Sequence, residues 1–120
     1  MTKKYLISGG AGFIGSALAN YLVNNGEQVV VIDNLSTGFR DNVPEEATFI
    51  EMDCSNPEHY NLLPDDKFDA IIHLAAQSSG EKSFLDPWHD FNSHVTATFL
   101  MLQHCLKRKN KRFIYSSSMS

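Results

Sequence analysis

The chain has 120 residues, of which 42% are hydrophobic and 20% charged, with a net charge of −4. This length and balance are typical of one soluble globular domain. The small net charge argues against a nucleic-acid partner. Cys54 and Cys105 form no CxxC pair, so they predict no disulfide framework or zinc site and fit a reducing compartment, the cytoplasm. No signal peptide and no membrane-spanning run is recognisable.

Short apolar runs alternate with helical patterns along the chain. The runs predicted to be strands are 4–8, 28–33, 47–53, 69–76 and 112–116. The first helix is expected to begin near residue 13 and to end at Gly26, a residue type that suits the position after a helix. Its expected apolar face is Ile14, Leu18, Tyr21 and Leu22. Segment 34–44 is interpreted mostly as loop, and a short helix is expected from Pro57 with Asn56 as its cap.

The longest helical pattern covers residues 86–110. Apolar side chains recur there every three or four positions and predict one stripe packed into the core. The stripe consists of Trp88, Phe91, Val95, Phe99, Leu102 and Leu106. The basic cluster 107–112 is interpreted as cations at the C-terminus of this helix, where the helix dipole is negative.

Strands that alternate with helices predict parallel pairing through right-handed crossovers. The sequence therefore predicts an α/β fold with a doubly wound parallel sheet in the order 3-2-1-4-5. In such sheets ligands bind at the carboxyl ends of the strands. The row Ser116-Ser117-Ser118 follows the fifth predicted strand and belongs to that edge.

The segment "ISGGAGFIGS" (7–16) is the strongest functional signal. It contains both G-x-G-x-x-G and G-x-x-G-x-x-G, and it directly follows a strand and opens a helix. One glycine makes the tight turn, a second lets the backbone approach a pyrophosphate, and the third lets the helix pack on the sheet. The helix N-terminus then offers amide donors and partial positive charge to phosphates. The alternative, a glycine-rich turn without a ligand, is disfavoured by this context.

Asp33 ends the second strand, 18 residues after Gly15. A carboxylate there is placed to accept hydrogen bonds from the adenosine ribose hydroxyls, and it repels a 2′-phosphate, so NAD is favoured over NADP. Arg40, seven residues further on, keeps NADP as the alternative.

These motifs resemble the extended short-chain dehydrogenase/reductase superfamily, in its NAD-dependent epimerase/dehydratase group. The resemblance covers residues 4–120 and is carried by "GGAGFIGS" (9–16), "DNLSTG" (33–38), the pair 53–54, "HLAAQ" (73–77) and "S-x-x-x-P" (83–87). It implies a Rossmann-like domain that binds NAD. The cofactor contacts it implies are Gly9, Gly10, Gly12, Phe13, Ile14, Gly15, Asp33, Asn34, Ser36, Thr37, Gly38, Asp53, Cys54, Leu74, Ala75, Ala76, Gln77, Ser93, Ser116 and Ser117.

The resemblance also implies that Ser118 is a catalytic hydroxyl that works beside a Tyr-x-x-x-Lys pair. None of the 4 tyrosines has a Lys four positions later. Residues 1–120 are therefore expected to be an incomplete NAD-binding domain, truncated after strand five, without its C-terminal substrate domain and inactive alone. The expected parent enzyme is a nucleotide-sugar epimerase, with a UDP-sugar as substrate and a homodimer as assembly.

Two alternatives stay open at this point. The first is a dehydratase or reductase of the same superfamily, although the triplet Ser118-Met119-Ser120 lacks the acid pair that the dehydratase branch carries. The second is a non-catalytic module that senses NAD. His94 stands where the family has Asn, so that contact is not carried over. The spacing of His89, His94 and His104 does not match a metal pair, and no metal site is expected.

Overall fold

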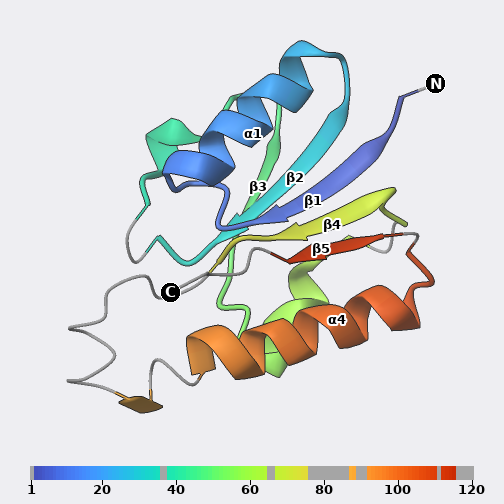
Figure 1. Cartoon of the computed structure of the whole chain (residues 1–120). Helices are drawn as coiled ribbons and strands as arrows, with labels where there is room; N and C mark the ends of the chain where they lie inside the picture. Colours follow the sequence, from blue (N-terminus) through green and yellow to red (C-terminus); the bar gives the residue numbers. More distant parts are fainter. Residues whose placement is uncertain are drawn as a thin grey trace.

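A computed structural model describes residues 2–35, 38–64, 67–75, 87–88, 92–110 and 112–115. Within these residues, five strands form one parallel sheet in the order β3-β2-β1-β4-β5 (Figure 1). The strands are β1 (Lys4–Ser8), β2 (Gln28–Asp33), β3 (Thr48–Glu51), β4 (Ala70–His73) and β5 (Phe113–Tyr115). The helical elements are α1 (Phe13–Asn24), η1 (Arg40–Asn42), η2 (Pro57–Leu62), η3 (Asn92–Thr96) and α4 (Ala97–Lys107). The predicted fold class and strand order are confirmed.

The central strand β1 pairs with β2 on one side and with β4 on the other. Its register places Ser8 beside Ile32 in β2 and beside His73 in β4. Strands buried on both faces need continuous apolar runs, and β2 has five consecutive buried residues after Gln28. This requirement explains why the apolar runs in the sequence located the central strands.

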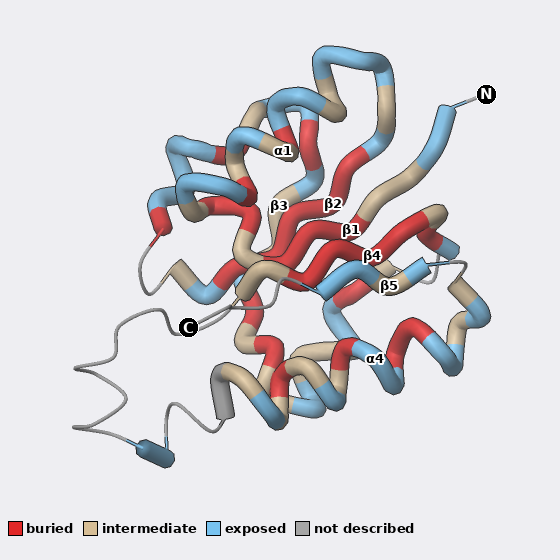
Figure 2. Tube along the Cα trace, in the orientation of Figure 1, coloured by how far each residue is buried: buried red, intermediate tan, exposed pale blue. Residues whose placement is uncertain are grey.

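The sheet is covered on both faces. Figure 1 shows α1 on one face, and η2 and α4 on the other. On the α1 side the buried cluster includes Ile7, Ala19 and Val31. On the α4 side it includes Leu6, Phe68 and Met101. Figure 2 shows the buried residues concentrated along the central strands, between these two layers.

The face of α1 that packs on the sheet differs from the predicted one. Gly15 and Ala19 are buried, and Leu18 and Leu22 pack against the core. Ile14 and Tyr21, which were expected on the apolar face, are exposed, so that part of the prediction is wrong. The small residues decide the orientation, because only they allow the helix backbone to lie close to the turn that follows β1.

The predicted apolar stripe of the long helix also faces outward. Phe99 is 62% exposed and Leu106 is 69% exposed. Trp88, Val95 and Leu102 are exposed as well, whereas Phe91 lies outside the described residues. The residues of α4 that pack on the sheet are Ala97, Met101, His104 and Cys105. The helix is therefore apolar on two opposite sides, and the core prediction is corrected.

Local signals before the short helix are confirmed. Asn56 caps η2, because its Oδ1 accepts a hydrogen bond of 3.0 Å from the Glu58 amide. Pro57 occupies the first turn, where its missing amide costs nothing. The helix is 3₁₀ in form. Segment 34–44, expected mostly as loop, contains the short turn η1.

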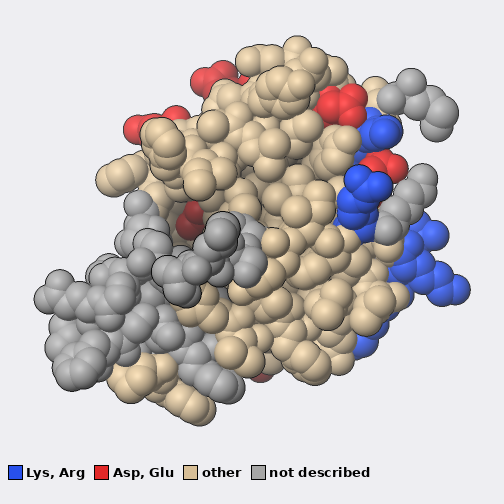
Figure 3. Space-filling model, in the orientation of Figure 1, with Lys and Arg blue, Asp and Glu red and all other residues tan. Residues whose placement is uncertain are grey.

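Lys and Arg side chains gather on the side of the molecule where the strands begin (Figure 3). The described residues of the basic cluster, 107–110 and 112, follow the C-terminus of α4 as predicted. The side where the strands begin is the end of the sheet opposite to the carboxyl ends of the strands. None of the described helices combines the length and the apolar character needed to cross a bilayer.

The helices α1 and α4 are each followed by a residue with positive φ and by the same hydrogen-bond pattern. Gly26 (φ +81) follows α1, and the next amide bonds to the Leu22 carbonyl at 3.0 Å. Lys109 (φ +54) follows α4, and the Asn110 amide bonds to the Cys105 carbonyl at 3.0 Å. A side chain makes this conformation costly.

We therefore expect Lys109→Gly to stabilise the protein by about 0.5–1 kcal/mol, because glycine removes the strain. Gly26→Ala is expected to destabilise it by about 1 kcal/mol through backbone strain alone, since a Cβ there meets no atom within 4 Å. Urea unfolding of both variants measures these changes. A destabilised Lys109→Gly would contradict the strain argument.

Candidate functional site

The glycines of the turn after β1 lie against the start of α1, the end of β4 and the Val31 side chain of β2. A Cβ on Gly15 would lie 2.2 Å from the Gly9 carbonyl oxygen, so only glycine permits α1 to start there. Gly9 has φ +74, and a Cβ on it would lie 2.9 Å from the Ala75 nitrogen. A Cβ on Gly10 would collide with the Val31 side chain at 2.4 Å. These three glycines are required by the packing of the protein itself.

Gly12 is different from the other glycines of the turn. Among the described residues, a Cβ on it would have a single near neighbour, the Gly9 oxygen at 3.4 Å, and its φ of −83° is open to any residue. Packing within the described protein therefore does not explain a glycine there. A ligand that approaches the backbone closely does explain it.

The open space beside Gly12 lies at the N-terminus of α1. Gly12 is the N-cap residue of this helix, and no side chain caps the first amides. Helix geometry leaves the amides of Phe13, Ile14 and Gly15 without partners inside the helix. The first turn contains no acidic residue that would neutralise the helix dipole. The arrangement is suited to bind an anion such as a pyrophosphate.

Asp33 lies at the end of β2 and is only 8% exposed. Its Oδ2 accepts a hydrogen bond of 3.0 Å from the Ala11 amide, and its Oδ1 accepts one of 2.7 Å from the Leu35 amide. These bonds hold the carboxylate beside the glycine turn and place Leu35 at φ +61. Each carboxylate oxygen keeps further acceptor capacity, which suits it for ribose hydroxyl groups.

The loop after β2 folds over Ala11. The Phe39 amide and the Asn42 side-chain amide both donate to the Ala11 carbonyl, at 3.1 and 3.0 Å. A Cβ on Gly38 would lie 2.6 Å from the Ala11 carbonyl carbon, so the glycine is required there. Sequence reasoning missed Ala11 and Asn42, because no local pattern indicates a contact across 31 residues.

Arg40 lies on the same loop. Its guanidinium group stands 4.6 Å from the centre of the Phe49 ring in β3, in a cation–π contact. Such contacts favour a fixed position for the cation at the surface. Arg40 thus has a structural role that does not depend on a 2′-phosphate.

The segment after β3 is held by side chains from η2. The Asp53 amide donates to His59 Nδ1 at 2.9 Å, and the Tyr60 hydroxyl donates to the Cys54 carbonyl at 2.8 Å. The Asp53 carboxylate accepts from the amide and the hydroxyl of Ser55. This segment is therefore fixed in place before any ligand arrives.

Cys54 is buried, with 5% of its surface exposed. Burial, together with the charges of Asp53 and Asp33, raises the pKa of the thiol to about 12. The neutral thiol belongs to the core, so any cofactor contact at this position would come from the backbone.

Ser8 and His73 meet at the carboxyl ends of β1 and β4. The Ser8 hydroxyl lies 2.7 Å from His73 Nδ1, and it accepts hydrogen bonds from the amides of Leu74 and Ala75 at 3.0 and 3.1 Å. The imidazole stacks on Phe113 and Tyr115 of β5, with centroid distances of 6.2 and 6.0 Å. The sequence analysis included His73 in the motif "HLAAQ" (73–77) but did not identify Ser8.

The described residues thus bring the glycine turn, Asp33, Gly38 and the ends of β3 and β4 to one edge of the sheet. Asn34 follows Asp33 and is exposed. Ser93 belongs to η3, and nothing further is described of its side chain. The remaining predicted residues lie outside the described part of the chain: Ser36, Thr37, Ala76, Gln77, Ser116, Ser117 and Ser118.

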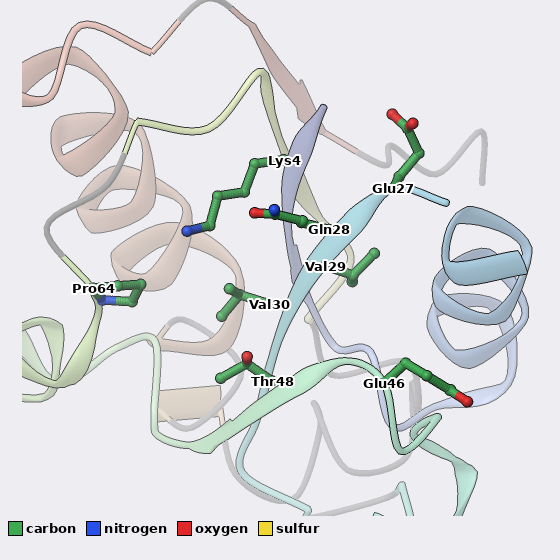
Figure 4. Close-up of a pocket in the computed structure, with 8 residues that line it drawn as sticks. All are labelled: Lys4, Glu27, Gln28, Val29, Val30, Glu46, Thr48 and Pro64. Carbon is green, nitrogen blue, oxygen red and sulfur yellow. The ribbon is translucent and has the colours of Figure 1, made fainter. Parts of the chain in front are cut away.

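A hollow lies at the opposite end of the sheet, where the strands begin (Figure 4). It has a volume of about 310 Å³ and is lined by Lys4, Glu27, Gln28, Val29, Val30, Glu46, Thr48 and Pro64. Lys4, Gln28 and Thr48 are the first residues of their strands. Ligands of parallel α/β sheets bind at the other end of the strands, so this hollow is not the candidate site. In the described part of the chain no three His, Cys, Asp or Glu side chains gather to hold a metal ion.

Taken together, the parallel sheet, the glycine turn at the start of α1 and the acid at the end of β2 define a dinucleotide-binding α/β domain. Comparison with known proteins identifies the class more closely. The NAD dependent epimerase/dehydratase family matches residues 5–120. The chain belongs to this family.

Three similar proteins illustrate the relationship. UDP-glucose 4-epimerase of Streptomyces lividans is 36% identical over 98% of this chain and 36% of its own length. The structure of UDP-glucose 4-epimerase from Thermotoga maritima with UDP-glucose has a TM-score of 0.91 and 34% identity, over 96% of this chain and 38% of that one. The Thermus thermophilus UDP-glucose 4-epimerase in complex with NAD has a TM-score of 0.86 and 32% identity, over 96% and 37%.

The chain thus spans little more than a third of the length of these relatives. The resemblance in the sequence and the expected family are confirmed, and the family is defined by its dependence on NAD. The Thermus thermophilus relative was solved with NAD, the cofactor that the sequence favours over NADP.

The buried imidazole of His73 makes stability depend on pH. Burial, with a smaller contribution from the charge of His94, lowers the pKa of His73 from 6.5 to about 4. Between these values the unfolded chain binds a proton that the folded chain does not. The contribution of His73 to the free energy of unfolding is therefore fully present above about pH 6.5. It decreases as the pH falls toward 4, by about 3 kcal/mol in total.

We expect His73→Asn, which keeps an acceptor for Ser8 but does not titrate, to lose less stability over this pH window than the wild type. Urea unfolding at several pH values measures the difference. Parallel pH curves for the two proteins would show that His73 is not the responsible group.

Proposed function

We propose that this chain is the NAD-binding portion of a nucleotide-sugar epimerase-like oxidoreductase. The observation that carries the proposal is Gly12, the one glycine of the turn whose Cβ position the described residues leave open, at the N-terminus of α1. Asp33, which accepts a hydrogen bond from the amide of the preceding residue, Ala11, supplies the acceptor that an adenosine ribose requires.

Each part of the site has a task in this proposal. The pyrophosphate is bound by the amides at the start of α1, where donors and dipole favour negative charge. Asp33 accepts hydrogen bonds from the ribose hydroxyls and repels a 2′-phosphate. Asp53 and the Cys54 backbone, fixed by η2, border the adenine. Leu74 and Ala75 line the cofactor at the end of β4. The bound NAD supplies reversible hydride transfer.

The substrate is proposed to be a UDP-sugar, since relatives carry the name UDP-glucose 4-epimerase and one neighbour holds UDP-glucose. Ser118 is proposed as a catalytic hydroxyl that hydrogen-bonds the reacting sugar oxygen. Within residues 1–120 no Tyr is followed by Lys four positions later, so a proton-transferring pair of that type is not supplied by them. We therefore expect the 120-residue chain to bind NAD without turning over UDP-sugars.

The cellular location is proposed to be the cytoplasm. Cys54 and Cys105 are buried free thiols, and free thiols of this kind persist in a reducing compartment.

Calorimetric titration of the chain with NAD tests the function. Gly12→Ala is expected to fold like the wild type and to weaken NAD binding by about tenfold or more, because the new methyl group occupies the pyrophosphate position. Gly26→Ala is the matched control, since it adds the same methyl group at the far end of α1 and is expected to leave binding unchanged. NADP is expected to bind more weakly than NAD.

A folded wild-type chain that binds no NAD would overturn the proposal. Equal binding by the wild type and Gly12→Ala would show that the phosphate does not lie at the start of α1.

We further propose that the outward stripe of α4 mediates a homodimer. The stripe consists of Phe99, Leu102 and Leu106 of α4 together with Val95 of the preceding η3, all exposed on the side that faces away from the sheet. Exposed apolar side chains that are contiguous mark association surfaces. A second copy would bury the same stripe against its own, as two-fold symmetry requires.

Sedimentation equilibrium tests this assembly. Phe99→Glu is expected to convert dimer to monomer, because it places a charge in the centre of the stripe. Ala17→Glu, which adds the same charge on the exposed side of α1, is expected to leave the dimer intact. A wild-type chain that is monomeric at all concentrations would refute the proposed dimer.

A further inference from the structure

The Ser8 hydroxyl has three hydrogen-bond partners and only one proton. The amides of Leu74 and Ala75 both donate to its oxygen. These two bonds use the acceptor capacity of a hydroxyl, so its own proton must be donated to the remaining partner, His73 Nδ1, at 2.7 Å. His73 Nδ1 is consequently an acceptor, and the neutral imidazole carries its proton on Nε2.

The two amides depend on Ser8 to different degrees. The Leu74 amide also lies 3.1 Å from the Ser8 backbone carbonyl, which is its normal partner in the parallel ladder. For the Ala75 amide the Ser8 hydroxyl oxygen is the acceptor, at 3.1 Å. The chain therefore leaves the regular sheet at Ala75 and is held there by the Ser8 side chain.

Ala75 is also the residue against which the glycine turn packs. Its nitrogen lies 2.9 Å from the position of a Cβ on Gly9, the residue that follows Ser8. The Ser8 side chain thus connects the end of β4 to the residue next to the turn that starts α1. Both Ser8 and His73 are almost completely buried, at 0% and 1% exposed, so water does not compete for these bonds.

We propose that Ser8 and His73 are positioning residues for the dinucleotide. The Ser8 hydroxyl, oriented by His73 Nδ1, holds the Leu74–Ala75 backbone next to the glycine turn. It thereby sets the distance between this backbone and the turn before the cofactor binds. This inference rests on the proposed NAD site. His73 acts through Ser8, and Ser8 acts through the Ala75 amide. Stacking on Phe113 and Tyr115 keeps the imidazole plane in the orientation that this chain of bonds needs.

The experiment combines amide hydrogen exchange, histidine ¹⁵N NMR and NAD titration on the 120-residue chain. In the wild type, His73 Nδ1 is expected to show the chemical shift of an unprotonated ring nitrogen. Ser8→Ala is expected to raise exchange at Ala75 by about tenfold or more, with a smaller change at Leu74, and to weaken NAD binding by about tenfold. Ser8→Thr keeps the hydroxyl and is expected to restore both properties.

Thr98→Val is the matched control. The Thr98 hydroxyl is also buried but has no hydrogen-bond partner among the described residues, so its removal is expected to change neither Ala75 exchange nor NAD affinity. If Ser8→Ala does not fold, the wild-type spectrum still tests the orientation of the Ser8 hydroxyl on which the inference depends.

Three outcomes overturn the inference. A protonated Nδ1 of His73 in the wild type would show that the Ser8 hydroxyl does not donate to it, and the inference depends on that orientation of the hydroxyl. Unchanged NAD affinity in folded Ser8→Ala removes the positioning role alone. A wild-type chain that binds no NAD overturns the proposed function, and the positioning role with it.

Discussion

Contact between backbone segments at the end of β1 is the constraint on which the rest of the site depends. The Gly9 carbonyl lies where a Cβ of Gly15 would be, so α1 can begin only where it does. This contact directs the first turn of the helix to the carboxyl ends of the strands. Without it the amides of that turn would not face the edge at which Asp33 and the end of β4 meet.

A buried carboxylate next to this contact makes the loops around it interdependent. An ionised group in a buried place is tolerated only when hydrogen bonds replace its water. Asp33 obtains two of them from backbone amides, one in the glycine turn and one in its own loop. The carbonyl of Ala11 in turn accepts from the loop that follows. The acid that recognises a ribose is therefore also the centre around which two loops are organised.

Most of the fold could be predicted because its signals are local. A central strand of a parallel sheet has to be apolar on both faces, and β2 shows this in five consecutive residues. The glycine motif was recognisable because its spacing is a local pattern, although only Gly15 meets its steric limit nearby, at the Gly9 carbonyl, whereas Gly9 and Gly10 meet theirs at Ala75 and Val31. Asn56 was recognised as a cap for the same reason, since its partner is two residues away.

The orientation of the helices could not be predicted in the same way. Periodicity shows that a helix carries an apolar side, but α4 carries two, and the larger side chains are on the outer one. The contact of Asn42 with Ala11 spans 31 residues, and that of Ser8 with His73 spans 65. Such pairs are not visible until the crossovers have brought the strands side by side.

The sequence by itself determined the alternation of strands and helices, the position of the glycine turn and the acid that follows β2, because each depends on sterics or polarity over a short stretch. Only the tertiary structure decided which side of each helix meets the sheet, which glycine is left open for a ligand, and which buried polar groups share a proton. These features depend on distances between segments that are remote in the chain, and packing of the whole domain sets those distances.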